Sequence, residues 1–158
     1  MKKIKNIGLL LFLTLSTLSF SYQVNYDDVV DIVLRNYPQS RVTKIEISNY
    51  KGKTVYEGET FNKGQKIEFI IDVNTGEVYK MDPNYDDEYN PSYNLPVTFE
   101  QANRIALDNS FNGRVKSIEL KNTDKKAYYV VEVRENKAEK VINIDANSGK
   151  VLNIKESM

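Results

Sequence analysis

The feature that most constrains this chain is an internal repeat at an offset of 73 residues. Residues 24–80 align with residues 97–153 without a gap, and 17 of the 57 aligned pairs are identical. A repeat has to be recognised before a chain is divided by length, because each copy is then one structural unit. We therefore expect two copies of one small module, although about 137 residues after a leader would also suit a single domain.

Each copy opens with the signals of a helix start. Thr98 is followed three residues later by Gln101, which is the spacing of a capping box, and Asn25 with Asp28 has the same spacing. Apolar residues follow at helical spacing, namely Tyr26, Val29, Ile32 and Val33 in the first copy and Phe99, Ala102, Ile105 and Ala106 in the second. This periodicity predicts one helix with a buried face in each copy.

After each helix the apolar period changes to 2, which is typical of strands. We predict four strands in each copy, over residues 43–47, 55–61, 67–73 and 78–80, and over residues 116–120, 128–134, 140–146 and 151–154. The predicted fold class is therefore α+β. It consists of two tandem modules, each an N-terminal helix packed on a four-stranded antiparallel sheet.

The most similar segments of the two copies contain the residues of a tight hairpin. These residues are Asp72, Asn74 and Gly76 in the first copy and Asp145, Asn147 and Gly149 in the second. Asp accepts backbone N–H groups in a turn, Asn tolerates unusual dihedral angles, and Gly adopts positive φ at little steric cost. We interpret them as structural turn residues, with a metal or ligand role of the two aspartates as the alternative.

Residues 81–96 lie between the copies and show no apolar period of either kind. They are rich in Pro, Asn, Asp and Tyr, which predicts a linker. The chain then divides into module one at 22–80, the linker at 81–96 and module two at 97–158. Because a module of about 60 residues buries only a thin core, we expect the two modules to pack on one another.

Residues 1–21 have the pattern of a secretory signal peptide. Three lysines precede the apolar stretch at 7–15, and Ser19 and Ser21 stand before the expected cleavage point. The stretch is shorter than the roughly 20 apolar residues of a membrane span, so an uncleaved anchor is the less favoured alternative. No cysteine occurs in the chain, which excludes lipid attachment to a cysteine and disulfide bonds. We expect a secreted or periplasmic protein of the cell envelope, without a membrane span after signal cleavage.

The repeat resembles the PepSY domain family. The resemblance rests on the order of helix and strands, on the strand at 128–133, and on the closing hairpin at 144–152, which is similar to the family pattern Asp-x-x-Ser/Thr-Gly-Lys-Val. The second copy also has Gly113 before its first strand, whereas the first copy lacks that glycine and has Glu77 in place of the lysine. The resemblance implies an α+β fold, a location outside the cytoplasmic membrane, and a non-catalytic role in restraining secreted peptidases or sensing envelope ligands.

The sequence contains neither histidine nor cysteine. Ser-His-Asp triads, Cys-His pairs and the usual zinc and copper ligand sets therefore cannot form. A carboxylate pair remains conceivable, because Glu46 recurs as Glu119 and Glu59 as Glu132. Their period-2 strands place them on solvent-facing positions, so we expect no enzyme activity and no cofactor.

The start of the linker is similar to the opening of a calcium-binding loop, with oxygen ligands at alternate positions. The candidate ligands are Asp82, Asn84, Asp86, Asp87 and Glu88. The glycine expected at the sixth position is missing, and Tyr93 stands at the twelfth position, where a bidentate Glu is needed. We prefer a solvated acidic linker and keep a small-ligand- or calcium-responsive envelope protein as the alternative function.

Two groups among the eleven tyrosines are informative. Tyr56 and Tyr129 occupy equivalent strand positions and are expected in the core. Tyr85, Tyr89 and Tyr93 lie in the linker and are candidate partner-binding residues, because tyrosine combines a rigid ring with a hydroxyl.

The charge of the chain bears on its partners. Without the three signal lysines, 19 basic side chains face 22 acidic ones, which gives no electrostatic reason to bind nucleic acid. The leading hypothesis is a binding module for a protein or peptide outside the cytoplasm, with a peptidase as one candidate partner. It would bind through a sheet face, the linker tyrosines or strand addition at a sheet edge.

Overall fold

The structure is a computed structural model and describes residues 23–84, 95–123, 126–136 and 138–157. Each copy of the repeat forms one helix and four strands, as the sequence predicts. Module one contains α1 (Tyr26–Asn36), β1 (Arg41–Tyr50), β2 (Lys53–Asn62), β3 (Gln65–Asp72) and β4 (Val78–Asn84). Module two contains α2 (Phe99–Asp108), β5 (Arg114–Thr123), β6 (Lys126–Glu135), β7 (Ala138–Asp145) and β8 (Val151–Ser157). The predicted signal peptide lies outside the described residues.

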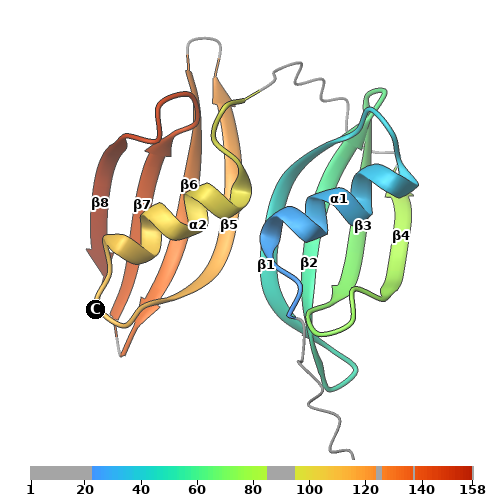
Figure 1. Cartoon of the computed structure of the whole chain (residues 1–158), viewed down its shortest axis with the longest axis horizontal. Helices are drawn as coiled ribbons and strands as arrows, with labels where there is room; N and C mark the ends of the chain where they lie inside the picture. Colours follow the sequence, from blue (N-terminus) through green and yellow to red (C-terminus); the bar gives the residue numbers. More distant parts are fainter. Residues whose placement is uncertain (1–22, 85–94, 124–125, 137, 158) are drawn as a thin grey trace, which may run out of the picture.

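The strands form one antiparallel sheet in the order β4-β3-β2-β1-β5-β6-β7-β8. The two predicted four-stranded sheets are therefore halves of a single eight-stranded sheet, joined by β1 and β5. In each half the helix lies across the same face of the sheet, and neither α1 nor α2 covers the opposite face (Figure 1). We call that opposite side the helix-free face.

The last strand of each module is longer than the sequence predicts. β4 ends at Asn84 rather than at Lys80, and β8 ends at Ser157 rather than at Ile154. The predicted linker therefore begins too early, because residues 81–84 continue the ladder with β3. The extension was hidden because Asp82 and Pro83 are poor strand formers, and proline is tolerated here only because β4 is an edge strand.

Both helices begin with the capping boxes that the sequence predicts. The Asn25 side chain accepts from the backbone N–H of Asp28 at 3.0 Å, and the Asp28 carboxylate accepts from the backbone N–H of Asn25 at 2.9 Å. Thr98 and Gln101 form the same reciprocal pair at the start of α2. These bonds satisfy N–H groups that have no partner within the helix itself.

One apolar core runs beneath both helices. Tyr56 and Tyr129 are only 5% and 2% exposed, so the prediction that they pack in the core is confirmed. Their hydroxyls donate to the carbonyl oxygens of Val24 and Val97 at 2.9 and 2.7 Å. Burial raises the pKa of both hydroxyls to about 12, so they remain protonated donors at neutral pH. Each tyrosine thereby fixes the segment that leads into its helix.

The two modules fill one equivalent part of the core differently. Gly58 lies opposite Phe69 in module one, whereas Val131 lies opposite Ile142 in module two. A Cβ atom on Gly58 would lie 2.4 Å from Cζ of Phe69 and 2.2 Å from the carbonyl oxygen of Lys44. In module one the large ring of Phe69 fills the space that the missing side chain of Gly58 leaves. In module two Val131 and Ile142, which are both of intermediate size, share the equivalent space.

The modules are joined through equivalent strands. β1 and β5 pair at three positions only, and the central pair is Ile45 with Ile118. These two residues are 73 apart, and both side chains are fully buried. An antiparallel pair between equivalent residues relates the modules by an approximate two-fold axis at this point.

A carboxylate adds a second link between the modules. Oδ2 of Asp27 accepts from the Thr98 hydroxyl at 3.0 Å, and Oδ1 accepts from the backbone N–H of Glu100 at 3.1 Å. Negative charge at a helix N-terminus is stabilised by the helix dipole and by the free N–H groups there. Asp27 of α1 therefore holds the start of α2, and the modules pack together as expected.

Candidate functional site

A cleft opens where α1 meets module two, and we call it the junction cleft. It is lined by apolar and by charged side chains, namely Val30, Leu34, Val42, Leu95, Phe99 and Leu120, and Asp27, Asp31 and Arg41. Val42, Phe99 and Leu120 are buried, whereas Leu34 is 37% exposed. The cleft therefore has an apolar interior that remains accessible from one side.

The two acidic residues of the junction cleft differ in whether their carboxylates are hydrogen-bonded. Asp27 is held by its two hydrogen bonds to the start of α2. Asp31 lies one turn further along α1, is exposed, and forms no ion pair or hydrogen bond with the described residues. Only Asp31 is thus available to a cationic group that enters from solvent.

The Asp-Asn-Gly segments form tight turns in both modules. Oδ1 of Asp72 accepts from the N–H groups of Asn74 at 2.9 Å and Thr75 at 3.0 Å, and Gly76 has φ of +71°. Asp145 makes the same bonds with Asn147 and Ser148, and Gly149 has φ of +72°. These contacts use the aspartates to hold the backbone of the turn.

Module one adds a side-chain network to its turn. The Tyr79 hydroxyl donates to Oδ2 of Asp72 at 2.7 Å and accepts from Nζ of Lys53 at 2.7 Å, while its ring stacks on Tyr50 with a centroid separation of 6.0 Å. The Tyr79 hydroxyl, followed by the turn N–H groups, lowers the pKa of Asp72 to about 2. In module two Leu152 replaces Tyr79, and the pKa of Asp145 is lowered mainly by the N–H and hydroxyl groups of Ser148.

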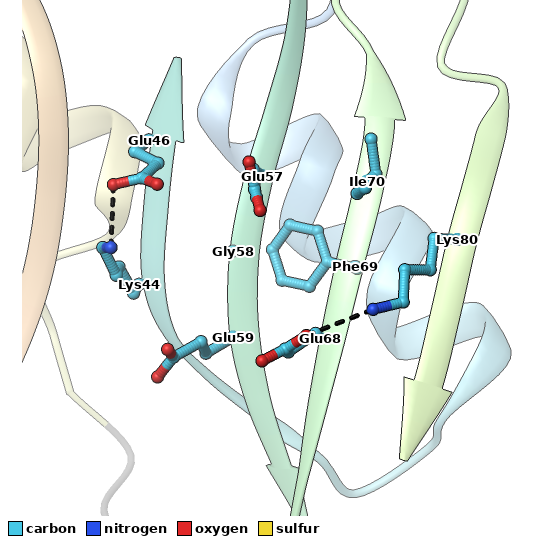
Figure 2. Close-up of a pocket in the computed structure, with 9 residues that line it drawn as sticks. All are labelled: Lys44, Glu46, Glu57, Gly58, Glu59, Glu68, Phe69, Ile70 and Lys80. Carbon is cyan, nitrogen blue, oxygen red and sulfur yellow. Dashed lines mark hydrogen bonds and ion pairs between the residues drawn. The ribbon is translucent and has the colours of Figure 1, made fainter. Parts of the chain in front are cut away.

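The helix-free face of module one carries a shallow depression rimmed by charged side chains. Figure 2 shows Lys44 beside Glu46 and Lys80 beside Glu68. The N–O distances of these two ion pairs are 2.7 and 3.2 Å. Glu59 is near Lys66 at 3.9 Å. Three of the recurring glutamates, Glu46, Glu59 and Glu119, thus lie on strand positions where a lysine is within ion-pair distance. Within the described ranges, no group of three or more acidic side chains is placed to hold a metal ion.

Six of the sequence-predicted site residues lie outside the described residues. These are Tyr85, Asp86, Asp87, Glu88, Tyr89 and Tyr93. Asp82 and Asn84 belong to β4, where backbone pairing with Glu68 and Lys66 fixes their positions. The two described candidates for calcium therefore lie on an edge strand rather than in a loop.

Sequence reasoning missed the junction cleft. Val30 and Leu34 are apolar and four residues apart, but they lie outside the stripe that predicts the buried face of α1. These two residues were the signal in the sequence, because a helix that buries only one face needs no further apolar residues outside that face. They indicate a second apolar surface on α1. The contribution of Leu120 could not be foreseen, since it depends on how β1 and β5 meet.

A capped helix laid across four antiparallel strands and repeated in tandem defines a class of small α+β modules. The model of one family, described as "Peptidase propeptide and YPEB domain", matches residues 23–82 and 96–155. These matches cover both modules and most of the chain, which therefore belongs to the PepSY family. The resemblance found in the sequence is confirmed, including its occurrence twice.

A solved structure supports the same arrangement of two modules. The chain is similar to a crystal structure described as a "putative lipoprotein" from Clostridium difficile 630, with 25% sequence identity and a TM-score of 0.62. The similarity covers 86% of this chain and 95% of that one. No curated protein matches the chain. The family and this neighbour together fit an envelope protein without a catalytic role.

Among the described residues, neither helix is long and apolar enough to span a bilayer.

Proposed function

We propose that this chain is an exported, non-catalytic PepSY protein that binds a protein or peptide partner outside the cytoplasm. The junction cleft carries this proposal, because it offers an accessible apolar surface next to an available carboxylate. Such a combination of apolar surface and a few polar groups is typical of binding sites.

The side-chain chemistry supports binding rather than catalysis. The chain has no histidine or cysteine to act as nucleophile or base. Of its recurring glutamates, Glu46 and Glu59 lie on strands beside Lys44 and Lys66. The proposal therefore assigns the protein no reaction of its own.

A secreted or envelope peptidase is the kind of partner we propose. The support is the description of the family, which refers to peptidase propeptides. An eight-stranded sheet with a cleft where its two halves meet offers a preformed surface, and most preformed interfaces move little on binding. Binding near the active site of a peptidase would exclude its substrates.

The proposal is tested by capture from the native envelope and culture supernatant. The mature chain, residues 22–158, is immobilised, and captured proteins are compared with those on an unrelated protein of similar charge. We expect a protein partner to be enriched and, if it is a peptidase, to lose activity when the mature chain is added. The absence of any partner above background would contradict the proposal.

A further inference from the structure

We infer that the junction cleft binds an extended peptide segment, with apolar side chains at alternate positions and a lysine or arginine that meets Asp31. This inference rests on the proposed function, since it names the chemistry of the partner segment. It is carried by three features of the cleft: diverging strands, an accessible apolar wall and an available carboxylate.

The strands at the cleft diverge, so the end of β5 has no strand of the described residues paired on its β1 side. β1 and β5 pair with each other at three positions, whereas β1 with β2 and β5 with β6 each pair at nine. From Leu120 onward β5 continues along β6 but is not paired with β1. A strand edge carries N–H and C=O groups that an extended peptide can pair with. The divergence thus provides a template for backbone hydrogen bonds that begins at Leu120, the residue of β5 that lines the cleft.

The apolar wall fits the side chains of such a peptide. Leu120 lies on the diverging part of β5 and is buried beside Phe99. Leu34 remains 37% exposed and Val30 is partly buried, so α1 offers contact surface above the strand edge. An extended peptide projects side chains to alternate sides, so every second residue can reach this wall while its backbone follows β5.

The charge of the cleft selects a basic residue. Asp31 is the carboxylate available to solvent there, while Asp27 is occupied by the start of α2. The equivalent residue of α2 is Arg104, which pairs with Glu100 at 3.6 Å. Arg41 also lines the cleft, so the cation of the peptide belongs beside α1 rather than beside the start of β1.

The probe for this inference is a library of random twelve-residue peptides displayed on phage and selected on the mature chain. We expect enriched peptides to alternate apolar residues and to carry a lysine or arginine. Their affinity should fall by about tenfold or more for Leu34→Asp and for Asp31→Arg. Asp31→Arg is an exposed helix substitution that copies the residue of module two, so it tests the charge without disturbing the core.

The matched control is Leu107→Asp, at the equivalent position of α2. Leu107 is 36% exposed, close to the 37% of Leu34, but it does not line the junction cleft. Peptide binding should survive this change. The inference is overturned if no peptide is enriched, if enriched peptides lack a basic residue, or if Leu34→Asp and Leu107→Asp weaken binding equally. A captured natural partner that binds the Leu34→Asp and Asp31→Arg variants normally would overturn the cleft assignment and leave the proposed function standing.

Discussion

Modules one and two share a fold but differ in how they fill it and in what they present to solvent. The identical residues include Tyr56 and Tyr129, which make the same bond from sheet to helix entry, and Asp72 and Asp145, which hold the same turn. The differing residues include Asp31 and its counterpart Arg104. The residues that are identical in both copies thus hold the shared fold in place. The residues that differ between the copies give each module its own core packing and its own surface.

The largest expected effect concerns the core pair that differs between the modules. Gly58→Val places atoms where the Phe69 ring and the Lys44 carbonyl already lie, so we expect a loss of about 3 kcal/mol in the free energy of unfolding. Urea unfolding followed by circular dichroism measures this loss.

A double variant separates the two causes of that loss. Gly58→Val with Phe69→Ile recreates the pair found in module two and should recover the part due to the ring. The clash with the Lys44 carbonyl remains, so recovery should be partial. A single variant as stable as the wild type would show that the two cores are interchangeable.

A smaller effect is expected at the tyrosines, and it should be the same in both modules. Tyr56→Phe and Tyr129→Phe each leave a buried carbonyl without its donor, which costs about 1 kcal/mol. Tyr26→Phe should be neutral or stabilising, because the buried Tyr26 hydroxyl has no hydrogen-bond partner among the described residues and the equivalent residue is already Phe99. Thermal unfolding of the three variants ranks them. A larger loss for Tyr26→Phe than for Tyr56→Phe would refute this assignment.

The turn aspartates should differ in their response to acid. The pKa of Asp72 is lowered to about 2 in the folded protein, so the stabilisation from its charged form is present above its ordinary pKa of 3.8 and is lost as the pH falls through about 2. Asp72→Asn should therefore destabilise the protein at pH 7 and cost less near pH 2. Asp145→Asn should show a weaker pH dependence, because module two has Leu152 in place of the tyrosine donor.

Unfolding free energies measured from pH 7 to pH 2 compare these variants. Tyr79→Phe serves as the control, because it removes the hydroxyl that contributes most to the lowered pKa of Asp72. This change should bring the pH dependence of module one closer to that of module two. An unchanged pH profile in Tyr79→Phe would contradict the role given to this hydroxyl.

The smallest expected effect concerns calcium. The acidic segment between the modules lacks the glycine and the bidentate glutamate of a calcium loop, so millimolar calcium should leave the melting temperature unchanged. Differential scanning calorimetry checks this. A stabilisation that disappears when Asp86, Asp87 and Glu88 are replaced by their amides would revive the calcium-responsive alternative.

The fold could be predicted largely because its determinants are local. Capping residues, apolar periods and turn residues such as Gly76 act within a few positions of one another, and a second copy showed which of them the fold requires. The junction could not be predicted in the same way. The pairing of Ile45 with Ile118 and the bond from Asp27 to Thr98 join residues at least 71 positions apart, and no local pattern specifies them.

The candidate site illustrates the same limit. Individual residues of the junction cleft, such as Leu34 and Asp31, were visible in the sequence as an extra apolar position and an acid on a helix. Their meeting with Leu120 arises only because β1 and β5 pair briefly and then diverge. The sequence therefore directed attention to the segment between the modules, whereas the structure places the candidate site where the modules touch.

The most direct test of this account is the affinity of the mature chain for its captured partner, measured by calorimetry for the wild type, Leu34→Asp and Leu107→Asp. These leucines occupy the same position of the repeat and are 37% and 36% exposed, but only Leu34 lines the junction cleft. The account predicts that the dissociation constant rises about tenfold or more for Leu34→Asp and stays unchanged for Leu107→Asp. Equal losses in both variants, or no loss in either, would contradict a binding site at the junction.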